Sequence, residues 1–162
     1  MKYFILVPAL LCVLTLNSQK SNYHIIKTIP FATGNGWINS SYETNLSNNG
    51  ALMLFADIVL INVDLISPGF VFGSGYRHYI GGRENPDPNG LFVQPEARYM
   101  IGNNQNDGSF GLVGFELGYQ KIWATGLGID LGIGPAYYTQ KIFSDQSIAP
   151  IATAALAYKF SE

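Results

Sequence analysis

The fold is decided by the stretch Gly126-Leu127-Gly128-Ile129-Asp130-Leu131-Gly132-Ile133-Gly134-Pro135-Ala136-Tyr137. Every second residue from Leu127 onward is aliphatic, proline or aromatic, and the residues between them are glycine, alanine or aspartate. Successive side chains of a β-strand point to opposite faces, so this alternation predicts a strand with one apolar face and one face of small or acidic residues. Small residues suit the crowded inside of a narrow barrel, and we therefore expect the apolar face to point outward.

The same alternation recurs along the chain in runs of about ten residues that end at clusters of Gly, Asn, Asp, Ser or Pro. These runs are 37–46, 52–60, 70–79, 91–101, 110–119 and 150–160. Residues 23–33 supply a further strand before Asn35-Gly36, because Asn-Gly is a strong signal for a tight turn. The sequence predicts an all-β fold, a single antiparallel up-and-down transmembrane β-barrel of about eight strands. Since Pro30 interrupts the first run, six strands with an irregular start are the alternative.

The composition is typical of such a barrel. The chain has 162 residues, of which 12% are charged and 14% aromatic, and it contains 18 glycines. Low charge with abundant glycine and aromatic residues suits strands that face lipid on one side and a crowded interior on the other. The length suits one domain. A formal net charge of -2, with scattered Lys and Arg, gives no basic surface, so we expect no nucleic-acid partner.

The first 18 residues have the pattern of a secretory signal peptide. Lys2 gives a positive start, the run from Phe4 to Leu14 is wholly apolar, and the small residue Ser18 follows. The apolar run is shorter than the roughly 20 residues that a membrane-spanning helix needs. We expect cleavage after Ser18 and a barrel domain over residues 19–162. Cys12 would leave with the signal, so no disulfide would hold the exported chain together.

Charged residues of the predicted strands fall on the face opposite the aliphatic side chains. The inward positions collect Glu43, Asp57, Arg77, Glu96, Arg98, Glu116, Asp130 and Lys159. A barrel of about eight strands has an interior that side chains can just fill. We therefore predict that these charges pair into a structural network that fills the interior. A narrow pore for small solutes is the alternative interpretation.

Few residues point to catalysis or to metal binding. Ser74 and His78 lie on one strand face four residues apart, which is too far for direct proton transfer, and alternation brings no acid beside them. An outer-membrane lipid-modifying hydrolase built on this pair is the alternative to a non-enzymatic role. His24 has no partners with which to form a metal site. We expect no catalytic residue, no metal and no cofactor.

Several segments resemble the small outer-membrane β-barrel proteins of unknown function found in Gram-negative bacteria, which share the architecture of OmpA-type and OmpX-type barrels. The segments are Ser41-Tyr42-Glu43, Gly75-Tyr76-Arg77-His78-Tyr79, Gly90-Leu91-Phe92-Val93-Gln94-Pro95-Glu96-Ala97-Arg98-Tyr99 and Ala157-Tyr158-Lys159-Phe160. Together they span nearly the whole chain after the signal. The resemblance implies location in the cell outer membrane. It also assigns the aromatic insertion signal to Phe160, which Ser161 and Glu162 follow here.

The sequence thus predicts a non-enzymatic outer-membrane barrel with a filled polar interior and with surface loops in a structural or adhesive role. The expected partners are outer-membrane lipid and, during biogenesis, the barrel-insertion machinery, and we expect a monomer. Interfacial girdles would be formed by the outward aromatic residues near strand ends, namely Tyr42, Tyr76, Tyr99, Tyr119, Tyr137, Tyr158 and Phe160. A soluble lipocalin-like barrel with reversed faces would need a more highly charged exterior.

Overall fold

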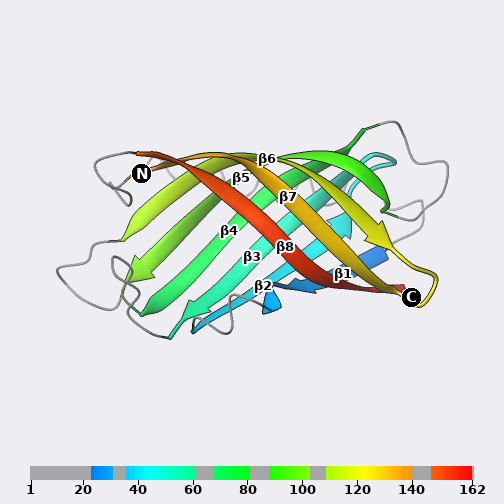
Figure 1. Cartoon of the computed structure of the whole chain (residues 1–162), viewed down its shortest axis with the longest axis horizontal. Helices are drawn as coiled ribbons and strands as arrows, with labels where there is room; N and C mark the ends of the chain where they lie inside the picture. The colour runs from blue at the N-terminus through cyan, green and yellow to red at the C-terminus, as the bar shows by residue number, and fades with distance from the viewer. Residues whose placement is uncertain are drawn as a thin grey trace, which may run out of the picture.

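The computed structural model describes residues 23–30, 36–60, 68–80, 88–102, 109–139 and 147–161. Eight antiparallel strands follow one another in chain order around a closed barrel (Figure 1). They are β1 (Tyr23–Thr28), β2 (Trp37–Asn45), β3 (Gly50–Val59), β4 (Gly69–Tyr79), β5 (Gly90–Gly102), β6 (Phe110–Ile122), β7 (Leu127–Tyr138) and β8 (Ile148–Ser161). The first strand pairs with the last and closes the ring. The predicted all-β class, the antiparallel up-and-down barrel and the number of strands are confirmed.

The alternation in the sequence sets the two faces of each strand. On β7, Leu131 and Ile133 point outward and are 48% and 63% exposed, whereas Asp130 points inward and is fully buried. The register keeps outward residues beside one another, since Leu131 lies opposite Tyr119 of β6 and Ala154 of β8. A one-residue slip would turn all of these side chains inward, so the pattern fixes the pairing.

Glycine on the inward face of β7 makes room for charged side chains. A Cβ atom placed on Gly132 would lie 2.7 Å from Oε1 of Glu116, which is itself buried on the neighbouring strand. Any larger residue at this position would displace the carboxylate. The glycines that the sequence places between aliphatic residues therefore serve the packing of the interior.

The first strand is shorter than predicted. It ends at Thr28 rather than at residue 33. Pro30 has no amide hydrogen to donate to a neighbouring strand, and it also restricts the backbone of the residue before it. The second strand begins directly after Gly36, whose φ angle of 72° turns the chain. The turn suggested by Asn35-Gly36 cannot be followed further, because residues 31–35 lie outside the described residues.

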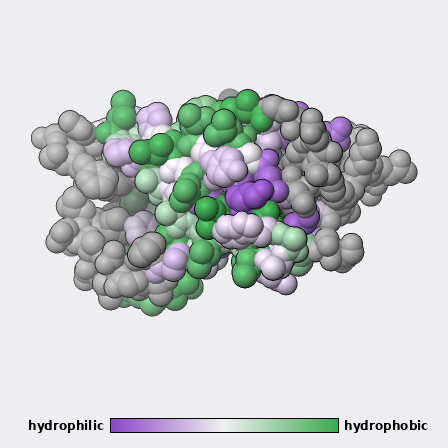
Figure 2. All heavy atoms as spheres, turned by 45° about the vertical axis from the view of Figure 1, so that its right-hand side comes forward, coloured by the Kyte–Doolittle hydropathy of each residue, from purple (hydrophilic) through white to green (hydrophobic). Residues whose placement is uncertain are grey.

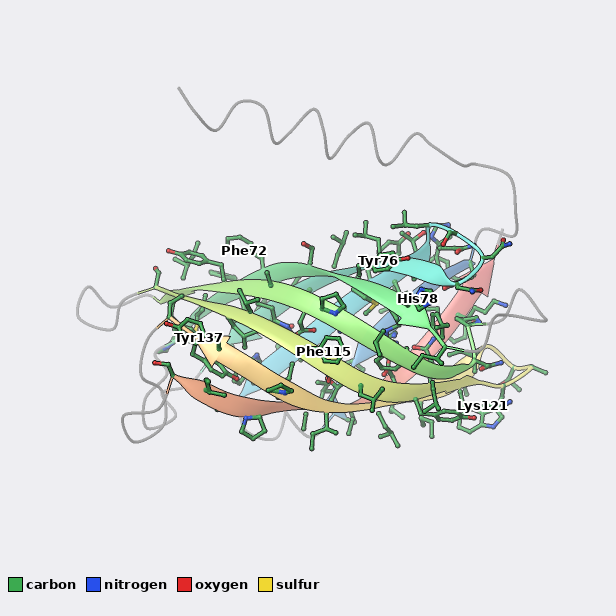
Figure 3. All side chains as sticks on the ribbon, turned by 90° about the horizontal axis from the view of Figure 1, so that it is seen from above. Phe72, Tyr76, His78, Phe115, Lys121 and Tyr137 are labelled. Atoms are coloured by element: carbon green, nitrogen blue, oxygen red, sulfur yellow. The ribbon has the colours of Figure 1, made fainter. Side chains whose placement is uncertain are left out.

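The outside of the barrel is apolar. Figure 3 shows Phe72, Tyr76, Phe115 and Tyr137 on the outer surface, and the exposed fraction of these four side chains lies between 43% and 52%. Figure 2 shows hydrophobic residues spread over the middle of one face, with a smaller hydrophilic area among them. Large apolar side chains that stay exposed over a whole surface mark contact with another apolar phase or partner.

Apart from Phe115 near the middle of β6, outward aromatic rings lie towards the two ends of the barrel. Towards the end where β1 begins and β8 ends, which we call the terminal end, His24 stacks on Tyr42 and Phe160 with ring centroids 5.7 and 5.6 Å apart. Towards the other end, which we call the loop end, Phe72 packs against Tyr99 at 5.8 Å. Aliphatic residues occupy most of the surface between these groups.

Candidate functional site

A layer of paired charges crosses the inside of the barrel. Nη1 of Arg77 on β4 lies 2.6 Å from Oδ2 of Asp130 on β7, three strands away around the ring. Nζ of Lys27 on β1 lies 2.6 Å from Oε2 of Glu43 on β2, and it also pairs with Asp130. All four side chains are at most 2% exposed, and they carry two charges of each sign. We call these four residues the charge layer.

Neutral polar side chains supply further hydrogen bonds to the charge layer. Nε of Arg77 donates to Oε1 of Gln94 at 2.8 Å, and the Tyr79 hydroxyl donates to Oε1 of Glu43 at 2.6 Å. Nε2 of Gln120 in turn donates to the Tyr79 oxygen at 2.9 Å. A buried ion pair offsets the loss of hydration only when its remaining donors and acceptors also have partners. These neutral groups therefore make the charge layer compatible with burial.

Apolar side chains close the barrel between the charge layer and the terminal end. Tyr23, Ile25, Ile122 and Ala157 form one buried cluster there. Beside it, the guanidinium carbon of Arg77 lies 3.5 Å from the centre of the Phe92 ring, within the range of a cation–π interaction. Among the described residues, these side chains pack across the interior between the charge layer and the terminal end.

A second group of charges lies on the loop side of the charge layer, and we call it the acidic group: Asp57, Glu96, Arg98 and Glu116. Nη2 of Arg98 lies 2.9 Å from Oε1 of Glu96, and its Nη1 lies 3.9 Å from Oδ2 of Asp57. Nε2 of Gln94 donates to Glu96 at 2.7 Å and to Glu116 at 3.2 Å, which links the two groups. Two carboxylates, those of Asp57 and Glu96, thus lie beside the one guanidinium of the acidic group, and Glu116 is joined to the group through Gln94.

The free space inside the barrel is unequal on the two sides of the acidic group. A void of about 20 Å³ lies between the acidic group and the charge layer, which is room for about one water molecule. On the loop side a cavity of about 260 Å³ opens above Asp57 and Arg98. Its wall is mainly apolar and includes the aromatic residues Trp37, Phe110 and Tyr138. The interior has the form of a cup whose floor is charged.

The structure places all eight interior residues expected from the sequence on the inward face. It brings three of them, Glu43, Arg77 and Asp130, into the charge layer. Four others make the acidic group. Lys159 is half-buried on β8, opposite Ile25 of β1. Lys27 was missed, although its place two residues after Ile25 puts it on the inward face of β1.

The other predicted features fall outside the interior or outside the described residues. Ser74 and His78 both lie exposed on the outer face of β4. Phe160 is 38% exposed on the outer face of β8, and its role as an insertion signal stays a prediction. The signal peptide over residues 1–18 lies outside the described residues. Within the described ranges, no three His, Cys, Asp or Glu side chains lie close enough together to hold a metal ion.

These observations define the chain as a closed eight-stranded up-and-down β-barrel with a charged interior and an apolar exterior. No protein-family model, curated protein or solved structure matches it. In the part of the chain that the structure describes, no helix is long and apolar enough to span a membrane.

Proposed function

We propose that this chain is an outer-membrane β-barrel with a blocked interior, and that it has a non-enzymatic role in structure or adhesion. One observation carries the proposal: the polarity of the barrel is the reverse of that of a soluble protein. Arg77, Glu43 and Asp130 are buried inside, while Val113, Ile133 and Ile148 on the outside are more than 60% exposed. Such an exterior is stable against lipid tails and unfavourable against water.

Strand length and the position of aromatic rings also support the proposal. A transmembrane β-strand needs about 9–11 residues. Strands β2 to β8 have between 9 and 14 residues, whereas β1 has 6. The aromatic groups at the terminal end and the loop end fit the headgroup regions on the two sides of a bilayer, where aromatic rings are favoured.

The orientation of the barrel follows from its even number of strands. Both ends of the described chain lie at the terminal end, which is the periplasmic side in bacterial barrels of this kind. The connections β1–β2, β3–β4, β5–β6 and β7–β8 then lie on the outer side. We assign contact with partners outside the cell to this loop end.

Membrane insertion is tested by fractionation and gel mobility. We expect the full chain to remain with outer membranes after a salt wash and to require detergent for extraction, because its exterior is apolar. An unheated sample in dodecyl sulfate should migrate differently from a boiled one, since the closed barrel resists unfolding until heated. A protein that stays soluble without detergent and shows one band in both conditions would contradict membrane insertion.

The blocked interior is tested by conductance in planar bilayers. We expect no steady ion conductance from the wild-type protein, because in the described part of the chain the charge layer and the apolar cluster at the terminal end pack across the interior. The Arg98→Ala variant should also show no conductance, because the shorter side chain enlarges only the cavity on the loop side. Conductance in the wild-type protein that rises in proportion to salt concentration would favour the narrow pore instead.

A further inference from the structure

We propose that the cavity at the loop end binds a small organic monocation with an apolar body, such as a primary alkylammonium or arylammonium ion. The site consists of a floor formed by Asp57 and Arg98 and a wall that includes Trp37, Phe110 and Tyr138. This inference goes beyond the proposed structural or adhesive role, and it depends on the folded barrel rather than on its membrane.

The floor of the cavity offers an unused acceptor for a cation. Asp57 is 2% exposed, yet among the described residues its Oδ2 atom accepts no hydrogen bond. The guanidinium of Arg98 lies 3.9 Å from Oδ2, and its other terminal nitrogen is 2.9 Å from Glu96. A buried carboxylate oxygen without a hydrogen bond is unfavourable, so an ammonium donor from a ligand would stabilise it.

The balance of charge also favours a cation. The acidic group has three carboxyl groups for one guanidinium, while the charge layer beneath it is balanced. An anion at the floor would face the carboxylates of Asp57 and Glu96 at close range in a medium of low dielectric. A neutral ligand could give Oδ2 of Asp57 only an uncharged hydrogen bond, which is weaker than one from an ammonium group. Nε of Arg98 and Nε1 of Trp37 are buried there without hydrogen bonds as well, but it is a positively charged head that offsets the excess of carboxylates in the acidic group.

The wall determines the rest of the ligand. Val71, Met100 and Leu112 contribute apolar surface, and the aromatic rings can contact a cation through their faces. The volume of about 260 Å³ is below the roughly 300–1,000 Å³ of pockets for drug-sized molecules. A compact apolar body that carries one ammonium group matches both the size and the polarity of the cavity.

The closed floor makes this a site for binding rather than for passage. Beneath the acidic group the free space falls to about 20 Å³, and the charge layer follows. A ligand must therefore enter and leave at the loop end. In the proposed orientation, the cavity opens towards the outside of the cell.

The two tryptophans allow a direct binding experiment. Trp37 lines the cavity, whereas Trp123 follows β6 at the terminal end and is 49% exposed. In the Trp123→Phe variant of the full chain, refolded in maltoside micelles, Trp37 is the remaining reporter. Its fluorescence is followed during titration with cyclohexylmethylammonium. Cyclohexylmethanol and cyclohexanecarboxylate serve as the neutral and anionic probes of similar shape.

We expect the ammonium probe to bind about 10- to 100-fold more tightly than the alcohol, the gain from a charged hydrogen bond to Asp57. The carboxylate should bind more weakly than either. In Asp57→Asn this preference should vanish while the affinity for the alcohol is unchanged, which shows that the cavity is intact. Arg98→Met should bind the ammonium more tightly, because it removes the cation that competes for Asp57.

A variant with a filled cavity is the control for probes that partition into the micelle instead of binding in the cavity. Val71→Phe places a ring in the cavity and should remove the response to all three probes. The inference is overturned if alcohol and ammonium bind equally to the wild-type site, or if Val71→Phe responds like the wild type. Each variant is first checked for the heat-dependent gel shift. A protein that shows the shift but does not prefer the ammonium disproves the site and leaves the proposed barrel function standing.

Discussion

Replacing Arg77 with methionine is expected to lower the free energy of unfolding by about 3–5 kcal/mol, as found when one partner of a buried ion pair is removed. The change leaves the carboxylates of Glu43 and Asp130 buried with Lys27 as their remaining cation in the charge layer. The loss is measured by denaturant unfolding of the barrel in phospholipid vesicles. Arg98→Met is the matched control, because Arg98 is 18% exposed beside the cavity, and it should cost clearly less.

A double variant separates the contribution of the ion pair to stability from the contribution of side-chain packing. In Arg77→Met with Asp130→Asn, one charge of each sign is removed, and Lys27 and Glu43 still form a neutral pair. The double variant should therefore be more stable than the sum of the two single losses predicts, by about 0.5–3 kcal/mol. Purely additive losses would show that Arg77 and Asp130 contribute independently, and the charge layer would not be a unit.

Arginine in place of Ile133 is expected to destabilise the barrel in a bilayer by about 2–4 kcal/mol, the cost of this charge at the midplane of a membrane. Ile133 lies near the middle of β7 on the outer face and is 63% exposed. In water a residue this exposed would accept arginine at little cost. The measurement is again denaturant unfolding in vesicles.

The matched control uses an isoleucine of equal exposure at the end of a strand. Ile148 is 64% exposed and is the first residue of β8 at the loop end. Ile148→Arg should cost only about 0–1 kcal/mol, because the side chain reaches the headgroup region. Equal and small losses at both positions would argue that no hydrocarbon surrounds the barrel.

The outline of the fold could be predicted because alternation and turn residues are local properties of the sequence. From Leu127 to Tyr137 each side chain lies on the face that the alternation in the sequence predicts. The end of β1 was predicted less well. Pro30 was recognised as unfavourable there, but the sequence does not show whether a strand bends past such a residue or stops before it. The structure shows that it stops at Thr28.

The site was predicted only in part. The alternation along a strand shows which side chains point inward, but it does not show which of them contact one another across the barrel. Alternation does not identify Lys27 as an inward residue, because Ile25 and Ile26 put apolar side chains on both faces of β1. The contact between Arg77 and Asp130 depends on how strands three places apart are staggered around the ring. That stagger follows from the closure of the whole barrel rather than from any single segment.

The cavity at the loop end was not predicted at all. It depends on the combined volume of side chains from several strands, among them Trp37, Met100 and Phe110. Side-chain volumes of single strands do not give the volume left between them. Only the assembled barrel shows that a cavity of about 260 Å³ remains in the loop half, beside the cluster of Val59, Val71 and Met100.

The pairing of β1 with β8 determines when, during synthesis of the chain, the barrel can close. His24 lies opposite Phe160, so the ring closes only when the last strand is available. Until then the two edge strands of the incomplete sheet present unpaired amide and carbonyl groups, which favour aggregation. Contacts so distant in sequence also make folding slow. We therefore expect a truncated chain that lacks β8 to leave β1 and β7 each without a neighbour on one side.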